Sequence, residues 1–249
     1  MLLGEAVDET GDAFTRLYHV KERLGDGGTA AVYAVVHRVT GEKLAVKIAV
    51  RRRQGSRWSR TMSVFQHEVA MLRRCQHPHI VQAHALYQSP NDLALVLEHV
   101  GGGDFQQLLE RHGSLAEHAV NIVITQVVEA LGHMHSVSVL HRDIKLENIL
   151  LVRLGASPCV KLCDLGHAAL VHSAHDSFTG TAGYSAPEVS DATSPAWSRA
   201  ADVWSVGCVM YAMLANSLLV WASDGPDFSS RMLAQVRLLL IASDFFGLS

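Results

Sequence analysis

The residues best suited to chemistry lie together in one short stretch, residues 141–148 (His-Arg-Asp-Ile-Lys-Leu-Glu-Asn). The carboxylate of Asp143 could act as a base, the ammonium group of Lys145 could reach a phosphate, and the amide of Asn148 could ligate a metal ion. Structural capping is the alternative role for such side chains. Their order and spacing favour a catalytic loop instead.

The pattern H-R-D-x-K-x-x-N resembles the catalytic loop of eukaryotic protein kinases of the serine/threonine type. Other kinase motifs occur in the expected order over about residues 20–210, and a chance match to one motif would not bring the rest with it. Within the family, the chain resembles calcium/calmodulin-dependent-like kinases most. The matching segments are residues 25–32 for the Gly-rich loop, 45–47 for the lysine of the third strand, Glu68 for its helix partner, 164–166 for D-F-G and 186–188 for A-P-E.

This resemblance implies ATP as the phosphate donor, Mg²⁺ as the cofactor and a protein with serine or threonine residues as the substrate. Asp143 would orient the substrate hydroxyl, and Lys145 would screen the developing charge. Lys47, paired with Glu68, would hold the inner phosphates. The residues implied to ligate magnesium are Asn148 and Asp164, and those implied to bind ATP are Leu24, Gly25, Asp26, Gly27, Gly28, Thr29, Ala30, Ala31, Val32, Ala45, Lys47, Glu98, Val100 and Asp104.

Each of these signals has a structural alternative when it is taken alone. The glycine loop resembles an ordinary strand turn, Lys47 a surface lysine, and Glu68 a solvated helix position. The chain also departs from the family pattern at Ala30, which replaces the third glycine of the loop, and at Leu165, which replaces the phenylalanine of D-F-G. Both changes keep the phosphate site and the magnesium ligand.

The segment between Asp164 and Glu188 is expected to regulate activity. By resemblance, Arg142 would pair with a phosphate on this segment, which an upstream kinase could add at Ser177 or Thr179. An exposed polar loop is the alternative.

The resemblance also implies contacts with the peptide substrate and within the catalytic loop. Thr181 would contact the Asp and Lys of the catalytic loop, and Asp202 would anchor that loop's backbone. Glu147 and Asp104 match positions that often contact basic peptide residues, and Asp104 could also bind the ribose. The basic run 51–60 is expected to be a solvated connector, with a docking patch as the alternative.

The composition excludes several other classes of protein. With 249 residues, 49% of them apolar, the chain can bury a substantial core. Its net charge of -3 gives no basic field for nucleic acid, so we expect no such partner. The four cysteines form no disulfide framework, which favours an intracellular location, cytoplasmic or nuclear. No signal peptide is indicated, and the apolar stretch 203–222 is expected to be a buried helix and not a membrane span.

Hydrophobic periodicity predicts a small antiparallel sheet followed by mostly helical sequence. The resemblance implies that these form an α+β, bilobal, protein-kinase-like fold, with a small antiparallel-sheet lobe followed by a larger, mainly helical lobe. One predicted helix directs Glu68 inward, and the glycine run 101–103 is expected to be a hinge. The predicted strands are 20–24, 31–37, 43–50 and 93–98, and the predicted helices are 64–75 and 120–134.

We expect an irregular leader at 1–17 and a kinase domain at 18–249, divided into lobes 18–98 and 99–249. The large lobe looks shortened because no late Asp-Pro-x-x-Arg segment follows. Glu188 would then lack its family arginine, for which Arg231 or Arg237 could substitute. The alternatives to an active kinase are therefore a pseudokinase that binds nucleotide or acts as a scaffold, and a truncated kinase fragment.

Overall fold

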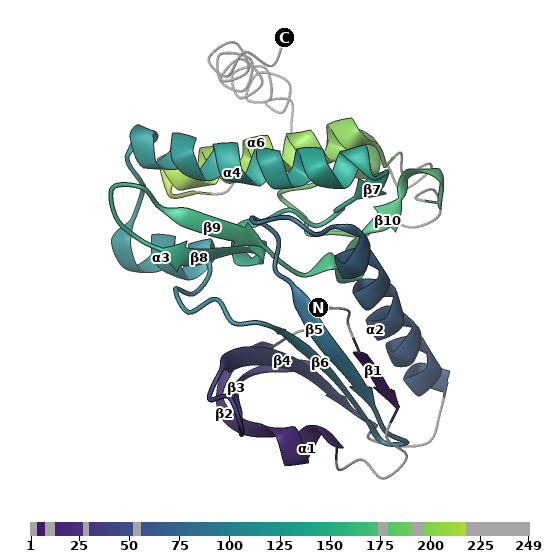
Figure 1. Ribbon diagram of the computed structural model, residues 1–249. Helices are drawn as coiled ribbons and strands as arrows, with labels where there is room; N and C mark the ends of the chain where they lie inside the picture. Colours follow the sequence, from purple (N-terminus) through teal and green to yellow (C-terminus); the bar gives the residue numbers. More distant parts are fainter. Residues whose placement is uncertain are drawn as a thin grey trace.

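The computed structural model describes residues 4–7, 13–26, 30–51, 56–173, 179–190 and 197–217. A twisted sheet with one long helix beside it forms one lobe, and two long helices above short strands form the other (Figure 1). The protein therefore has the α+β, two-lobed arrangement that the sequence predicts.

The small lobe is built on a six-stranded sheet in the order β1-β5-β6-β4-β3-β2. Neighbouring strands are antiparallel, except that β1 and β5 are parallel. The strands are β1 (Gly4–Val7), β2 (Tyr18–Asp26), β3 (Ala31–His37), β4 (Lys43–Val50), β5 (Ala83–Gln88) and β6 (Asp92–Glu98).

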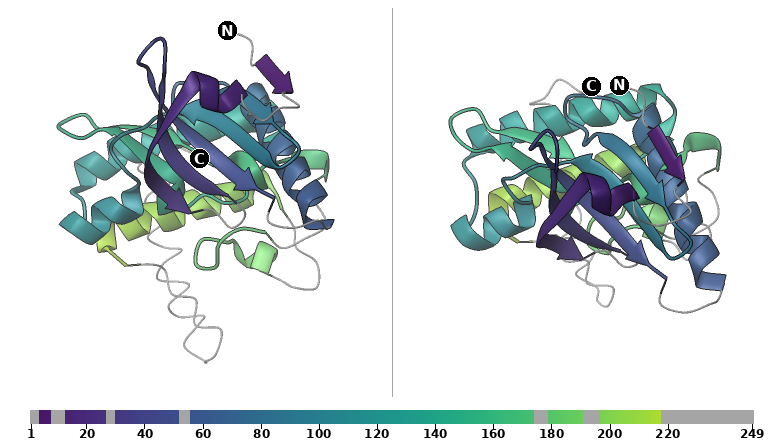
Figure 2. Two further views of the ribbon diagram at one scale, coloured as in Figure 1. Left: turned by 90° about the horizontal axis from the view of Figure 1, so that it is seen from below. Right: turned by 60° about the horizontal axis from the view of Figure 1, so that its bottom comes forward.

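The expectation of an irregular segment before Tyr18 is wrong for two stretches. β1 pairs with the edge strand β5, and α1 (Ala13–Leu17) leads directly into β2. Figure 2 shows β1 at the outer edge of the sheet. β1 has only four residues and is held by backbone pairing, so its alternation of apolar and polar residues is too short to be recognised in the sequence.

The two faces of the sheet have different partners, because alternate residues of a strand point to opposite faces. One face packs an apolar cluster that includes Val35, Val46 and Val96, and Phe14 of α1 lies against it. Val32 is paired with Lys47, and Ala45 is two residues from Lys47 on the same strand. These three residues therefore share the other face.

Helix α2 (Ser56–Arg74) packs beside β5 and β6 and also against the turn η2 (Leu165–His167) (Figure 1). It begins eight residues before the expected start at 64. Residues 56–63 are mostly polar and give little apolar periodicity, which is why the sequence did not predict this part of the helix. The buried face is the expected one, and Glu68 on it is 1% exposed.

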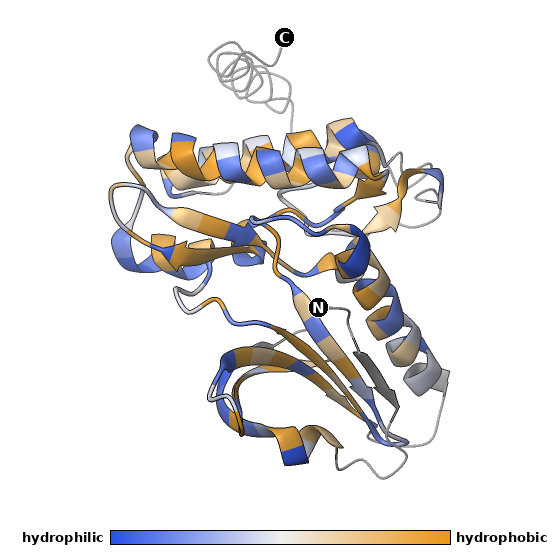
Figure 3. Ribbon diagram, viewed as in Figure 1, coloured by the Kyte–Doolittle hydropathy of each residue, from blue (hydrophilic) through white to orange (hydrophobic). Residues whose placement is uncertain are grey.

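In the large lobe, α4 (Glu117–Ser136) lies alongside α6 (Arg199–Ala215), and apolar residues run along the strands below them (Figure 3). The expected helix 120–134 is confirmed within α4. The remaining elements are α3 (Phe105–His112), β7 (Val139–Leu140), η1 (Leu146–Asn148), β8 (Ile149–Arg153), β9 (Cys159–Leu162), β10 (Ala169–Leu170), η3 (Val171–Ser173) and α5 (Pro187–Ser190).

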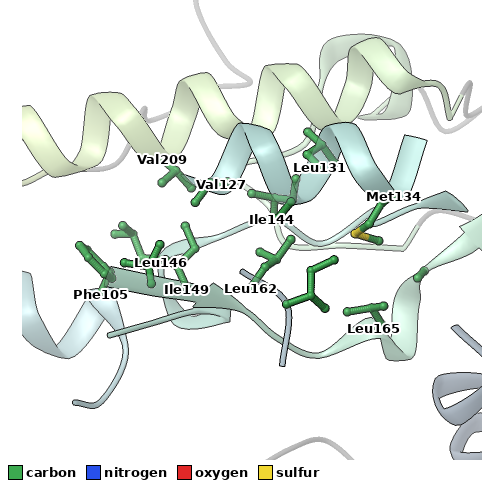
Figure 4. Packing of buried hydrophobic residues seen from close by; sticks show 14 of the residues in the cluster. Phe105, Val127, Leu131, Met134, Ile144, Leu146, Ile149, Leu162, Leu165 and Val209 are labelled. Carbon is green, nitrogen blue, oxygen red and sulfur yellow. The ribbon is translucent and has the colours of Figure 1, made fainter. Parts of the chain in front are cut away.

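The main apolar core holds the catalytic loop in place. Ile144 and Leu146 alternate with the polar residues of the loop and are 1% and 2% exposed. They pack among Val127 and Leu131 of α4 and Val209 of α6 (Figure 4). Burying such side chains contributes about 1.5–3 kcal/mol each. The apolar residues of the loop therefore fix the positions of the polar residues between them.

The apolar stretch 203–222 lies within α6 as far as Ala215, and the residues after 217 are outside the described part. None of the described helices is long and apolar enough to cross a membrane. The possible partners Arg231 and Arg237 of Glu188 also lie outside the described residues. Glu188 itself is exposed, so the desolvation penalty of an unpaired buried carboxylate does not arise at this position.

Candidate active site

Lys47 joins the sheet, α2 and the start of η2 through one ammonium group. Its Nζ lies 2.8 Å from Oε2 of Glu68 and 3.1 Å from Oδ1 of Asp164. Burial alone would lower the pKa of Lys47, but the two carboxylates outweigh burial and raise it. Lys47 therefore stays charged. The residue expected to hold the phosphates lies beside its expected partner Glu68 and also beside Asp164.

Asp143 is held by two neighbouring side chains. Oδ1 of Asp143 accepts a hydrogen bond from the Thr181 hydroxyl at 2.7 Å, and Nζ of Lys145 lies 2.9 Å from its Oδ2. Lys145 also donates to the Thr181 hydroxyl at 2.8 Å. Burial would raise the pKa of Asp143, but the hydrogen bonds from Lys145 and Thr181 outweigh it and lower the pKa. The carboxylate is therefore ionised and can accept a proton or a hydrogen bond.

The backbone of the catalytic loop is tied to Asp202, which is fully buried at the start of α6. Its carboxylate accepts from the N–H groups of His141 at 3.0 Å and Arg142 at 2.9 Å, and it lies 2.8 Å from Nε2 of His135. The sequence suggested the anchoring by Asp202. It gave no signal for His135, whose role depends on the packing of α4 against α6.

His141 links the catalytic loop to the strand that leads to Asp164. Its Nδ1 accepts from the N–H of Asp143 at 3.3 Å, so its Nε2 carries the proton and donates to the carbonyl of Cys163 at 3.2 Å. Burial lowers the pKa of His141, which favours this neutral form. One buried imidazole thus connects the backbone of Asp143 with that of Cys163, the residue before Asp164.

Asn148 and Asp164 fit the needs of a magnesium ion. The amide nitrogen of Asn148 donates to the backbone carbonyl of Asp143 at 2.7 Å and to its Oδ2 at 3.2 Å, so the amide oxygen is directed elsewhere. Burial would raise the pKa of Asp164, but Lys47 outweighs it, and the pKa is lowered. The side chain is 40% exposed. An anionic carboxylate and an amide oxygen are hard oxygen ligands of the kind that Mg²⁺ binds. The described residues contain no cluster of three or more His, Cys, Asp or Glu side chains suited to a metal.

Three of the expected nucleotide-binding residues, Val32, Ala45 and Lys47, share the inner face of the sheet, which is the face opposite the cluster of Val35, Val46 and Val96. Gly25 pairs with Val32. A Cβ at Gly25 would meet no atom of the described residues within 4 Å. Leu24 is 41% exposed, in keeping with a place at the outer end of β2.

Other expected nucleotide contacts are engaged within the protein or lie outside the described part. Oδ1 of Asp104 accepts from the N–H of Gln107 at 2.8 Å and so caps α3. The side chain of Glu98 lies 3.0 Å from Nζ of Lys161. Val100 follows the end of β6 and is partly buried. Ala31 on β3 is also partly buried, and Ala30, just before β3, is buried. Gly27, Gly28 and Thr29 lie outside the described residues, as does the side chain of Asp26.

Comparison with known proteins gives an independent assignment. The sequence model of the family described as "Protein kinase domain" matches residues 18–245. The chain belongs to the protein kinase family. It is similar to the serine/threonine-protein kinase cds1 of Schizosaccharomyces pombe, with 35% identity over 210 residues, covering 81% of this chain and 45% of that protein.

Two further relatives are kinases with a similar level of identity. The serine/threonine-protein kinase D2 of Homo sapiens is 36% identical over 199 residues, covering 79% of this chain and 22% of that protein. The calcium/calmodulin-dependent protein kinase type II of Caenorhabditis briggsae is 32% identical over 226 residues, covering 90% of this chain and 41% of that protein. The chain thus belongs to the serine/threonine type within the protein kinase family, and it spans less than half the length of each of these relatives.

The segment between Asp164 and Glu188, here called the activation segment, is described except for residues 174–178. Ser177 lies outside the described residues, whereas Thr179 forms a short hydrogen bond with Nδ1 of His167. Arg142 Nε donates to the carbonyl of His167 at 2.7 Å. The sequence gave no signal for His167, which joins two residues far apart in the chain. Leu165, the D-F-G variant, is fully buried in the main core, where an apolar residue is required.

Proposed function

We propose that this kinase domain transfers the γ-phosphate of ATP to serine or threonine hydroxyls of proteins. The observation that carries the proposal is the bridging ammonium group of Lys47, which lies within 3.1 Å of both Glu68 and Asp164. This arrangement joins three segments that are far apart in the sequence. Phosphoryl transfer depends mainly on positioning and charge stabilisation, and this group of side chains supplies both.

In this mechanism the protein's own residues position the reactants. Lys47 holds the inner phosphates of ATP on the inner face of the sheet, while Glu68 fixes the position of its ammonium group. Asp143 orients the substrate hydroxyl and accepts its hydrogen bond. Lys145 lies 2.9 Å from Asp143 and can screen the charge that develops on the transferred group. Asn148 and Asp164 would hold Mg²⁺, which supplies neutralisation of the phosphate charge.

Thr181 supports a preference for aliphatic hydroxyls. Its own hydroxyl lies between Lys145 and Asp143, at 2.8 and 2.7 Å. It thereby fixes the position at which a serine or threonine side chain would meet the Asp143 carboxylate. Glu147 is exposed and available to a basic residue of the substrate, which makes basic peptides the substrates to test first.

We further propose the boundaries and setting of the domain. The kinase domain occupies residues 18–249, with the small lobe at 18–98 and the large lobe at 99–249, and the leader at 1–17 packs onto the small lobe through β1 and α1. An intracellular location is supported by the cysteines, which are all free in the described residues. An upstream kinase acting at Ser177 or Thr179 would add a phosphate for Arg142 to bind.

The test is transfer of radiolabelled phosphate from ATP to a generic protein substrate. Asp143→Asn and Lys47→Met should each reduce the rate by at least about 100-fold, because each removes a group that acts directly on the reactants. Thermal melts of both variants, with and without nucleotide, would report their folding and binding. Equal signal from all three proteins would mean that a contaminant is the kinase, and the proposal would be wrong.

The same experiment separates the catalytic function from a scaffolding one. A native chain that binds ATP with a clear thermal shift but transfers no phosphate would be a pseudokinase. A chain that neither binds nor transfers would be an inactive fragment.

A further inference from the structure

Trp197 contacts the catalytic loop from a position outside all of the kinase motifs above. It precedes α6 and is only 4% exposed. The guanidinium carbon of Arg142 lies 5.7 Å from the centre of its ring. A guanidinium group within about 6 Å of a tryptophan face is attracted to it. Since Arg142 also donates to the carbonyl of His167, its side chain is held from two sides.

Arg142 and Trp197 together form the surface on which Gly180 rests. A Cβ atom at Gly180 would lie 2.7 Å from the carbonyl oxygen of Arg142 and 3.5 Å from Cη2 of Trp197. The φ of Gly180 is +103°, which also disfavours any residue with a side chain. The activation segment therefore lies against the catalytic loop at this point with no room between the two.

The residues on both sides of Gly180 are bonded as well. Thr179 is hydrogen-bonded to the imidazole of His167, the residue whose carbonyl accepts from Arg142. Thr181 donates to Asp143 at 2.7 Å. The position of Thr181 at the reactive carboxylate thus depends on Arg142 through Gly180 and through His167.

We propose that Trp197 is a positioning residue: by stacking on Arg142 it holds Gly180 and Thr181 against Asp143 without a phosphate on the activation segment. A phosphate that reaches Arg142 would then add a second attachment to a segment that is already in place. This inference rests on the proposed kinase function. It concerns binding and orientation of the protein substrate, and not of ATP, because Trp197 lies against Arg142 and Gly180 and packs with apolar residues such as Ala186 and Val189, none of which is expected to bind ATP.

The experiment compares Trp197→Leu with Trp197→Phe in the full chain after phosphatase treatment. The Nε1 of Trp197 is buried and has no hydrogen-bond partner among the described residues, so phenylalanine keeps the aromatic face without losing a hydrogen bond. Val189→Ala is the matched control, because Val189 is fully buried in the same apolar cluster as Trp197. It loosens that packing without removing an aromatic ring.

The first measurement is steady-state phosphorylation of a basic peptide. We expect W197L to lower kcat/KM for the peptide about tenfold, equivalent to about 1.4 kcal/mol, with KM for ATP changed less than about twofold. W197F should retain at least about half of the native value, and V189A should do the same. The inference is wrong if W197L matches the native chain, or if V189A shows the same loss as W197L.

The second measurement does not need activity. Amide hydrogen exchange of residues 179–183 should accelerate at least about tenfold in W197L and stay near native in W197F. Unchanged exchange in W197L overturns the positioning role. A native chain with no phosphate transfer would instead refute the proposed function, and the exchange result would still decide whether Trp197 orders the segment.

Discussion

Replacing Gly102 with alanine tests how the segment between the two lobes is held. A Cβ atom at Gly102 would lie 2.1 Å from the carbonyl oxygen of Leu151 and 2.9 Å from its carbonyl carbon. Contacts below 3.0 Å essentially do not occur for real Cβ atoms. Because the obstructing atoms belong to the backbone of β8, no side-chain rotation can relieve the clash. The backbone at Gly102 and the backbone of β8 must therefore move apart.

The separation would break two backbone hydrogen bonds. Gly102 donates to the carbonyl of Leu151 at 2.9 Å, and Leu151 donates to the carbonyl of Gly103 at 2.8 Å. Each contributes about 1 kcal/mol net. Forcing a methyl group into a packed site adds about 1–3 kcal/mol. The expected loss is therefore about 3–5 kcal/mol, a large part of the roughly 5–15 kcal/mol that stabilises a domain.

Urea unfolding followed by tryptophan fluorescence measures this loss, and the melting temperature should fall by on the order of 10 °C. Gly101→Ala is the matched control, because its nearest neighbour is a ring atom of His99 at 3.4 Å, which can rotate away. It should change stability by less than about 1 kcal/mol. If Gly102→Ala is as stable as Gly101→Ala, the pairing with β8 is not as tight as we infer.

The same contacts bear on the hinge predicted for residues 101–103. Gly102 and Gly103 are tied to β8, and residue 104 also bridges to Leu150. Any closing motion of the lobes would therefore be absorbed before Gly102. The hinge itself stays a prediction. Slower hydrogen exchange at the Gly102 amide than at the Gly101 amide would support a hinge that lies before Gly102.

Three further predictions concern the site and its supports. Asp202→Asn should lower the free energy of unfolding, measured in urea, by about 2–4 kcal/mol. The reason is that the new amide NH₂ group would face three donors, the imidazole of His135 and the N–H groups of His141 and Arg142. An unchanged free energy of unfolding would show that the buried charge is not needed. Thr181→Val should reduce peptide phosphorylation by at least about tenfold, whereas Thr181→Ser, which keeps the hydroxyl on Asp143, should not; equal rates would remove that hydroxyl from the mechanism. Burial and the positive charge of the neighbouring His133 lower the pKa of His77 below its ordinary value of 6.5. The unfolded chain therefore binds the proton more readily, and stability should fall as the pH drops below about 6.5. His133→Phe should weaken that dependence in denaturation series from pH 8 to about 5.5, and the same slope in both proteins would count against it.

The parts of the fold that could be predicted are those encoded by local patterns. Alternation on β3 and β4 and the spacing of Glu68 on α2 located the elements that hold Lys47, and the motif order indicated which residues meet. The strand β1 and the helix α1 were not predicted, because each is too short to show a period and is held by contacts with distant strands.

The supporting contacts of the site could not be predicted for a related reason. His135 meets Asp202 across 67 positions of the chain, and Arg142 meets His167 across 25 positions. Nothing in the local sequence distinguishes these histidines from the other histidines of the chain. The role of His135 follows from the packing of α4 against α6, and that of His167 from the contact of η2 with Arg142 of the catalytic loop. The residues that do the chemistry were therefore easier to find than the residues that hold them.

The backbone of Arg142 shows why those supports matter to function. Its φ is +66°, a left-handed conformation that costs a residue with a side chain about 1–2 kcal/mol. In this conformation the N–H groups of His141 and Arg142 both reach the carboxylate of Asp202. Each hydrogen bond to a charged group contributes about 1.5–3 kcal/mol, so together they outweigh the strain. The same conformation places the Arg142 carbonyl against Gly180. One buried carboxylate therefore determines both the shape of the catalytic loop and the surface on which the activation segment rests, and loss of Asp202 should disturb Thr181 without any direct contact between the two residues.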